Sequence, residues 1–185
     1  IYLNLVGGQD DQVFDGGTFA LNPGGELALQ MPLFEEEIAH LDLVREGGGW
    51  RAVPGALASI PSSLEQDYHA MVLALRDYLR KTGFAKVLLG LSGGIDSAIV
   101  ATIAADALGP GNVRCVMLPS EYTSEASLND AQAIAGNLGC RYDTVPISAS
   151  RAAVTETLAP FFQDTAPGVT EENIQSRLRA LLLMA

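Results

Sequence analysis

The stretch with the greatest chemical content is Gly90-Leu91-Ser92-Gly93-Gly94-Ile95-Asp96-Ser97. Two adjacent glycines carry no Cβ, so the backbone N–H groups around them can approach a ligand closely. At the start of a helix such unpaired N–H groups bind anions. The hydroxyls of Ser92 and Ser97 add donors, and each hydrogen bond to a charged oxygen contributes about 1.5–3 kcal/mol. The loop is therefore predicted to bind a phosphate group.

Asp96 conflicts with this prediction unless a cation is present. A carboxylate beside phosphate oxygens is repulsive, and Mg²⁺ bound by both relieves the repulsion. The formal net charge of −11 also opposes an anionic ligand, but charges beyond a Debye length of ~8 Å are screened, so the local donors dominate. We therefore predict a nucleotide phosphate bound with Mg²⁺, and Asp96 as the metal ligand.

The residues around this loop predict alternating strands and helices. Residues 87–91 form a continuous apolar run, typical of a parallel strand covered on both faces. After the loop, apolar residues recur every four positions from Ile95 to Ala107 and predict a helix. Further strands are expected at 113–118 and 141–147, and further helices at 124–138, from Ser148 and from about Thr170. This order predicts an α/β fold with a parallel sheet and flanking helices.

The first third of the chain has a different composition. It is rich in glycine, and Asn22-Pro23-Gly24-Gly25 separates two short apolar stretches, which predicts a β-hairpin. We expect a β-rich piece over residues 1–49, a linker over 50–61 and a second domain over 62–185. The second domain is expected to begin with a helix capped by Ser62 or Ser63 and ended by Gly83.

The composition excludes several classes of protein. With 48% hydrophobic residues the chain is not disordered. Only 11 Lys and Arg stand against 22 Asp and Glu, so nucleic-acid binding is not expected. Cys115 and Cys140 form no CxxC pair, which argues against a disulfide scaffold or a zinc site. No apolar run approaches the ~20 residues of a membrane span, and no signal peptide is visible, so we expect no membrane partner and a cytoplasmic location.

The loop matches neither the Walker pattern GxxxxGK[ST] nor the dinucleotide pattern GxGxxG. It resembles the SGGxDS loop of the ATP-pyrophosphatase (PP-loop) superfamily, whose fold is adenine nucleotide α-hydrolase-like. Members of this superfamily adenylate a substrate oxygen and release pyrophosphate. The resemblance implies that the loop binds the β- and γ-phosphates of ATP.

The flanking segments narrow the resemblance to glutamine-dependent NAD synthetases. Residues 2–10 (YLNLVGGQD) and 13–19 (VFDGGTF) resemble the end of the nitrilase-like glutaminase domain of that family. Four further stretches resemble the PP-loop synthetase domain of the same family: residues 118–120, 122–124, 129–131 and 172–177. No cap closes the last predicted helix and three strands make a small sheet. We therefore expect a fragment: the end of the glutaminase domain followed by the first part of the synthetase domain.

The resemblance implies ATP-dependent amidation of deamido-NAD to NAD with ammonia from glutamine. The reaction passes through an adenylated intermediate and releases AMP and pyrophosphate. ATP and Mg²⁺ are the implied cosubstrate and metal, and the full-length enzyme is expected to be a homo-oligomer. The family's glutaminase cysteine, glutamate and lysine lie upstream of the matching segment, and a further metal-binding glutamate and substrate lysines lie downstream. The isolated chain is therefore expected to be inactive.

The resemblance also assigns candidate site residues. Those for ATP are Gly90, Leu91, Ser92, Gly93, Gly94, Ile95, Asp96, Ser97, Met117, Leu118 and Pro119. The last three end the second strand, where their backbone could meet adenine or where they could simply pack in the core. Asn173 and Arg177 share a helix face and are implied to bind deamido-NAD, although a solvated polar face would look the same. Ser120, Tyr122, Thr123 and Ser124 either line the nucleotide cleft or cap a helix.

Two other functions remain open. The chain could be another PP-loop adenylating amidotransferase, such as a GMP or asparagine synthetase, or a tRNA-modifying enzyme. The acidic composition argues against tRNA, and the nitrilase-like flank argues against the others. It could also be a nucleotide-binding fragment without activity.

Overall fold

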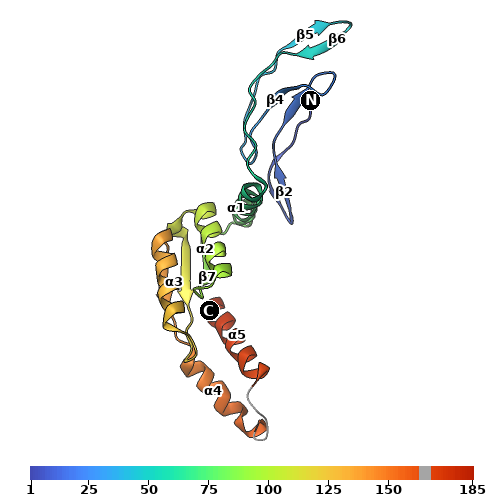
Figure 1. Cartoon of the computed structure of the whole chain (residues 1–185). Coiled ribbons are helices and arrows are strands. Elements are labelled where there is room, and N and C mark those ends of the chain that lie inside the picture. Colours follow the sequence, from blue (N-terminus) through green and yellow to red (C-terminus); the bar gives the residue numbers. More distant parts are fainter. Residues whose placement is uncertain (163–167) are drawn as a thin grey trace. The chain divides into compact units, whose positions relative to one another are not determined.

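The computed structural model describes residues 1–162 and 168–185 of the chain (Figure 1). It divides into two compact units, Ile1–Phe84 and Ala85–Ala185, and each is described by itself. This division falls later in the chain than the predicted domain boundary at residues 61 and 62. The reason is that helix α1 (Ser63–Thr82) packs on strands of the first unit.

Three antiparallel hairpins make up the strands of the first unit. They pair β1 (Val6–Gln9) with β2 (Gln12–Asp15), β3 (Phe19–Leu21) with β4 (Leu27–Gln30), and β5 (Leu43–Glu46) with β6 (Gly49–Ala52). The second is the hairpin predicted around Pro23. The third was not predicted: its turn is formed by Gly47 and Gly48, both with positive φ, which suits a two-residue hairpin turn. The first residues of the predicted linker, 50–52, therefore lie in a strand.

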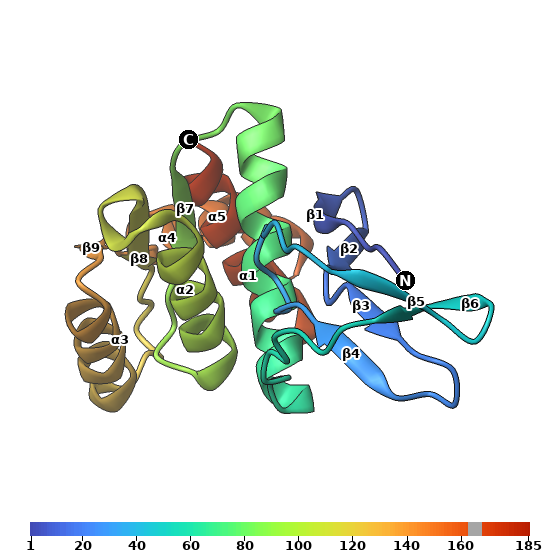
Figure 2. The ribbon, with the colours of Figure 1, turned by 90° about the horizontal axis from the view of Figure 1, so that it is seen from above.

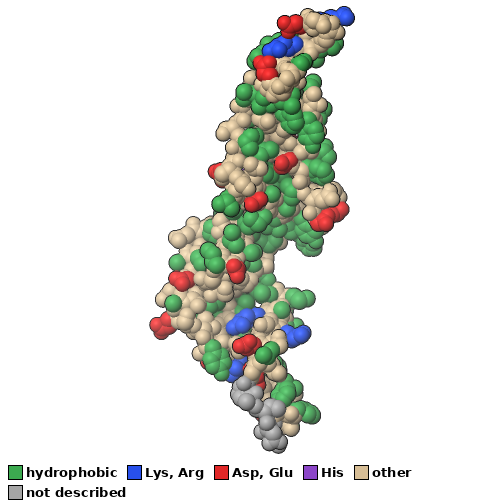
Figure 3. Space-filling view, turned by 45° about the vertical axis from the view of Figure 1, so that its right-hand side comes forward, with side chains coloured by type: hydrophobic (Ala, Val, Ile, Leu, Met, Phe, Trp, Pro, Cys, Tyr) green, Lys and Arg blue, Asp and Glu red, His purple; other side chains and the backbone are tan. Residues whose placement is uncertain are grey.

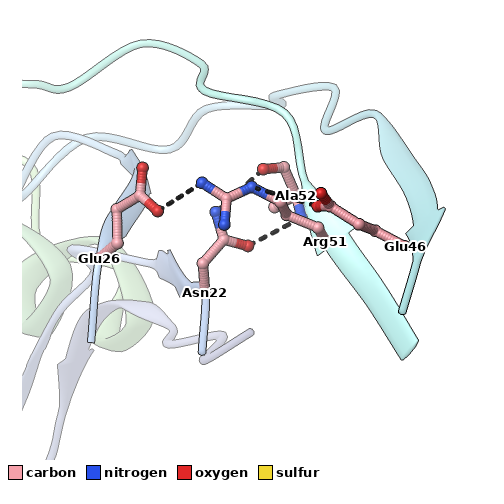
Figure 4. A network of polar contacts seen from close by, with 5 residues as sticks. All are labelled: Asn22, Glu26, Glu46, Arg51 and Ala52. Atoms are coloured by element: carbon pink, nitrogen blue, oxygen red, sulfur yellow. Dashed lines mark hydrogen bonds and ion pairs between the residues drawn. The ribbon is translucent and has the colours of Figure 1, made fainter. Parts of the chain in front are cut away.

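A buried asparagine joins the second hairpin to the third. The Asn22 side chain donates to the Ala52 carbonyl at 3.0 Å and accepts from the Ala52 N–H at 2.8 Å (Figure 4). Arg51 beside it pairs with Glu26 at 2.6 Å and lies 3.9 Å from Glu46. These ion pairs are exposed and contribute little, whereas the two hydrogen bonds of Asn22 are buried and satisfy both polar groups of its side chain.

Helix α1 is capped as predicted and is bonded to the first hairpin. Ser62 and Glu65 form a capping box, in which the Glu65 carboxylate accepts from the Ser62 N–H at 2.8 Å. The carboxylate of Asp77, a buried residue, accepts from the Gly8 N–H at 2.9 Å. Lys81, one turn further on, donates to the Gly8 carbonyl. These bonds fix the helix against β1.

The second unit contains the predicted parallel sheet, with its strands in the order β7 (Val87–Gly90), β8 (Val113–Met117) and β9 (Arg141–Thr144). Its main helices are α2 (Ile95–Leu108), α3 (Glu125–Leu138), α4 (Ser148–Leu158) and α5 (Val169–Met184), with short 3₁₀ helices η1 (Pro110–Asn112) and η2 (Ala159–Phe161). Figure 2 shows α2 and α3 on one side of the sheet and α5 on the other. The α/β prediction is confirmed for this unit.

The core of the second unit ties α5 to the end of the sheet. Val116, Leu118 and Ile147 form a buried cluster, and Leu182 and Leu183 of α5 pack against it.

On the surface, hydrophobic side chains cover much of the visible face of the first unit (Figure 3). No helix among the described residues combines the length and apolar character that crossing a bilayer requires.

Candidate functional site

The predicted phosphate loop lies where β7 passes into α2, at the carboxyl end of the sheet. Gly93 has a φ of +82°, and a Cβ at this position would lie 2.4 Å from the Ser127 carbonyl oxygen. Sequence reasoning explained the glycines by the approach of a ligand. At Gly93 the close approach is instead made by the protein's own backbone at the start of α3.

Two serine hydroxyls brace the loop. Ser97 Oγ accepts from the Ser92 N–H at 3.1 Å and donates to the Gly94 carbonyl at 2.9 Å. Ser92 Oγ lies 3.0 Å from Ser97 Oγ and accepts from the Gly94 N–H at 3.3 Å. Both hydroxyls therefore shape the backbone of the loop, a role in addition to the ligand contacts predicted for them.

The N-terminus of α2 keeps its donors available. Its N-cap residue, Gly94, supplies no side-chain hydrogen bond. The N–H groups of Ile95, Asp96 and Ser97, the first residues of the helix, have no acceptor within the helix. Together with the helix dipole, these groups favour an anion at the end of the loop.

A cavity of about 440 Å³ opens beside this loop, at the carboxyl ends of β7 and β8. Its lining comes from four parts of the second unit: Gly90, Leu91, Ser92, Val116, Met117, Leu118, Tyr122, Thr123, Ser124, Ser127, Arg179 and Leu183. The structure thus brings the beginning of the predicted loop together with two of the three predicted residues that end β8.

Other predicted residues lie outside the lining of this cavity. They are Gly93, Gly94, Ile95, Asp96, Ser97, Pro119, Asn173 and Arg177. Asp96 is exposed in the first turn of α2, and Asn173 and Arg177 are exposed on α5. The Pro119 carbonyl accepts from the Ile147 N–H at 2.9 Å, so it is engaged by the segment after β9.

The residues after β8 were expected either to line a cleft or to cap a helix, and the structure contains both a cavity lining and a helix cap in this segment. Ser124 is the N-cap of α3, where its side chain accepts from the Ser127 N–H at 3.1 Å, and it also lines the cavity. Tyr122 and Thr123 line the cavity as well. Ser120 lies outside the lining and donates its N–H to Thr123 Oγ1 at 3.0 Å.

Arg179 is the main residue that sequence reasoning missed. It is half-buried, lines the cavity and donates from Nε to the Leu118 carbonyl at 3.1 Å. Leu183, four residues later, lines the cavity from the same helix face. The spacing of this arginine and leucine, beside the apolar stripe of α5, could have indicated that Arg179 faces the sheet. The family resemblance assigned a site role to Arg177 instead.

Comparison with known proteins supports the family that the sequence of the loop and its flanking segments suggested. The family model described as NAD synthase matches residues 67–185. The chain belongs to the NAD synthase family. The matched region begins within α1, so the family domain includes most of a helix that packs with the first compact unit.

Full-length relatives in the family carry the name that the sequence resemblance suggested. The chain is 63% identical over its whole length to the glutamine-dependent NAD(+) synthetase of Rhodobacter capsulatus and covers 34% of that protein. It is 48% identical to the Synechocystis enzyme, of which it covers 33%. The chain therefore spans about a third of the length of the curated relatives it matches, and the resemblance found in the sequence is confirmed.

A solved structure supports the same relationship across both units. The glutamine-dependent NAD+ synthetase of Acinetobacter baumannii, solved in complex with ADP, matches all of this chain with a TM-score of 0.94 and 41% identity, over 35% of its own length. The NH3-dependent NAD synthetase of Campylobacter jejuni matches 67% of the chain with a TM-score of 0.58 and 28% identity, over 52% of its own length.

The donor set at the loop fits a magnesium ion that arrives with a nucleotide. Asp96 is one exposed carboxylate, and among the described residues no cluster of three His, Cys, Asp or Glu side chains could hold a metal. Mg²⁺ keeps several waters and is usually bound by one or two carboxylates together with substrate phosphates. A single carboxylate beside a phosphate loop therefore suffices for such an ion.

The two cysteines do not take part in this chemistry. Cys115 is fully buried in β8, and burial raises the pKa of its thiol to about 11. Burial also raises the pKa of the Cys140 thiol. Because the thiolate is the nucleophile and the metal ligand, neither side chain is suited to those roles near neutral pH.

Proposed function

We propose that this chain forms part of an enzyme that amidates deamido-NAD to NAD, using ATP and ammonia derived from glutamine. The observation that carries the proposal is the cavity of about 440 Å³ beside the SGGIDS loop. It lies in a chain 41% identical to a synthetase solved with ADP. The matches to NAD synthetases favour this function over the other PP-loop amidotransferases considered from the sequence.

The chemistry explains why a phosphate site is needed. A carboxylate oxygen is a poor leaving group, so the nicotinate carboxylate is first adenylated, and ammonia then displaces AMP. Pyrophosphate leaves in the first step and gains negative charge. The N–H groups at the start of α2 would stabilise that charge, and the Ser92 and Ser97 hydroxyls would exchange their bonds within the loop for bonds to the phosphates. Mg²⁺ held by Asp96 would neutralise part of it when bound.

We assign the two nucleotides to different parts of the second unit. ATP occupies the cavity, with its phosphates at residues 90–97 and its base near residues 117–119. Deamido-NAD meets Asn173 and Arg177 on α5, and the Arg177 guanidinium pairs with its phosphates. The support is that α5 also supplies Arg179 and Leu183 to the cavity, so one helix borders both proposed sites.

The remaining parts of the proposal concern the whole enzyme. Residues 1–49 would be the end of a nitrilase-like glutaminase domain, 50–61 a linker and 62–185 the start of the synthetase domain; the family match from residue 67 supports the last. We further propose a homo-oligomer in the cytoplasm. A protein containing this chain at its relatives' full length should release AMP and pyrophosphate, and release of ADP would contradict adenylation.

The role of the loop can be tested on the chain itself by calorimetric titration with ATP. In the presence of Mg²⁺, Asp96→Ala should bind ATP about tenfold more weakly, because a charge-assisted contact of about 1.5 kcal/mol is lost. With EDTA the order should reverse or the difference vanish, because without its cation the Asp96 carboxylate repels the phosphates of ATP. Asp67→Ala, which removes an exposed carboxylate from α1, is the matched control. Equal affinity of wild type and Asp96→Ala for Mg-ATP would contradict the metal role.

A further inference from the structure

The backbone at the end of β8 presents its carbonyl groups alternately to two sides. The Met117 and Pro119 carbonyls accept N–H groups of the segment after β9, at 2.8 and 2.9 Å. The Val116 carbonyl accepts the Leu91 N–H at 2.9 Å on the side of β7. Because successive carbonyls of an extended chain alternate, Leu118 also faces the side of β7, where the cavity lies.

Arg179 supplies the hydrogen-bond donor that a neighbouring strand would otherwise provide to the Leu118 carbonyl. The chain that follows β7 has already turned into the phosphate loop at this level, so it offers no backbone donor to the Leu118 carbonyl. The Arg179 Nε–H supplies that donor from α5 at 3.1 Å. The carbonyl keeps a second lone pair, so it can accept one further hydrogen bond from a ligand.

The Leu118 N–H lies next to this carbonyl and is not engaged. In the part of the chain that the structure describes, no hydrogen bond donated by the Leu118 N–H is found. Leu118 therefore offers one backbone donor and one backbone acceptor to a cavity that it lines. The Watson–Crick edge of adenine is complementary to such a pair, with its amino group as donor and N1 as acceptor. Guanine carries its donor and acceptor in the reverse order.

The packing around Leu118 holds helix α5, and with it Arg179, in a fixed position at the end of the sheet. Leu118 is only 6% exposed, and Leu182 and Leu183 pack against the cluster to which it belongs. A Cβ on Gly90, the last residue of β7, would lie 3.3 Å from Leu183 Cδ1, so α5 lies closely against the strand end. With α5 held in this way, the guanidinium can fix the orientation of the Leu118 peptide group.

We propose that Arg179 is a positioning residue that fixes the Leu118 backbone for adenine and so sets the preference of the cavity for ATP over GTP. This inference rests on the proposed function, because it requires the nucleotide base to bind at the end of β8. It differs from a phosphate-binding role, in which the guanidinium charge would favour both nucleotides equally.

The test is calorimetric titration of the whole 185-residue chain with Mg-ATP and with Mg-GTP. Arg179→Met keeps an unbranched side chain of similar reach but removes the donor and the charge. It should weaken ATP binding about five- to tenfold, the value of one hydrogen bond, and leave GTP binding unchanged. Arg179→Lys retains a donor and should restore part of the preference for ATP. Arg45→Met, an exposed cation in β5, is the control for the change in net charge.

Three results would overturn the inference. Equal weakening for both nucleotides would show that the guanidinium binds the phosphates. An unchanged ratio of ATP to GTP affinity in Arg179→Met, with ATP still bound, would show that Leu118 needs no positioning, while the proposed function would stand. Failure of the wild-type chain to bind either nucleotide would reject the proposed function and the inference together.

Discussion

Single residues of the loop from Gly90 to Ser97 stabilise the fold of the loop itself. Gly93 adopts a positive φ and lies against the Ser127 carbonyl, while Ser92 and Ser97 bond to the loop backbone. These contacts brace the loop and hold the N–H groups at the start of α2 in place. Preorganised donors of this kind need not reorganise when charge develops on a leaving group.

Gly93→Ala is expected to lower both the stability of the chain and its affinity for ATP. The substitution combines a strained φ of +82° with a contact of 2.4 Å to the Ser127 carbonyl. We expect the free energy of unfolding to fall by about 1–3 kcal/mol in a urea titration, and ATP binding to weaken. Gly111→Ala is the control, since a Cβ there would meet nothing within 4 Å. Equal stability of the two variants would disprove the strain at Gly93.

Cys115 predicts a pH dependence of stability at the alkaline end. Its thiol has a pKa of about 11 in the folded chain because of burial, against about 8.5 when unfolded. A raised pKa stabilises the fold fully below about pH 8.5, and this contribution is lost as the pH rises towards 11. The free energy of unfolding should therefore fall from about pH 8 to pH 10 more steeply in wild type than in Cys115→Ser. Identical pH profiles would refute this.

At the scale of the elements, α1 and α5 each have two roles that sequence periodicity alone did not separate. The family match includes most of α1, yet the helix is bonded to β1 through Asp77 and Lys81. Helix α5 exposes Asn173 and Arg177, while Arg179 and Leu183 reach the cavity. Both cases arise because a helix presents several faces and its neighbours decide which one is used.

The capping box of α1 predicts a measurable contribution to stability. Ser62→Ala removes the side-chain acceptor for the Glu65 N–H and should lower the free energy of unfolding by about 1 kcal/mol. Ser63→Ala, at the first residue of the helix, should have a much smaller effect because this serine is not the cap. Chemical denaturation of both variants makes the comparison. A larger loss in Ser63→Ala would contradict the assigned N-cap.

At the scale of the whole molecule, the site described above belongs entirely to the unit Ala85–Ala185. The unit Ile1–Phe84 has no part in the cavity, and it exposes large apolar side chains such as Ile1, Leu3 and Ile38. The cavity is therefore a property of the second unit alone.

Hydrogen exchange measured by mass spectrometry tests this separation. Saturating Mg-ATP should slow exchange in the loop after β7 and in α5, because the ligand contacts both. The hairpins β1–β6 should show no change, since no residue of the first unit lines the cavity. Protection of comparable size in both units would show that the nucleotide site extends beyond the second unit.

Much of the site was predictable because it is local in sequence. The strand, loop and helix around Gly90 to Ser97 follow one another directly, and apolar runs and glycines mark each boundary. The parallel sheet also followed from the alternation of strands and helices, and the structure gives its strand order as β7-β8-β9. The β5–β6 hairpin was missed because its glycine turn looks the same as an irregular break when its strands are short and exposed.

The strand, loop and helix at residues 87–108, the α/β class and the family could all be predicted from the amino-acid sequence, because each depends on residue types at short, regular spacing. The close approach of Gly93 to Ser127, and the bond of Arg179 in α5 to Leu118 at the end of β8, could be seen only in the folded chain. These pairs lie far apart along the chain. Contacts of that kind depend on how helices pack across the sheet, and periodicity within one helix cannot specify which side chain meets a distant backbone group.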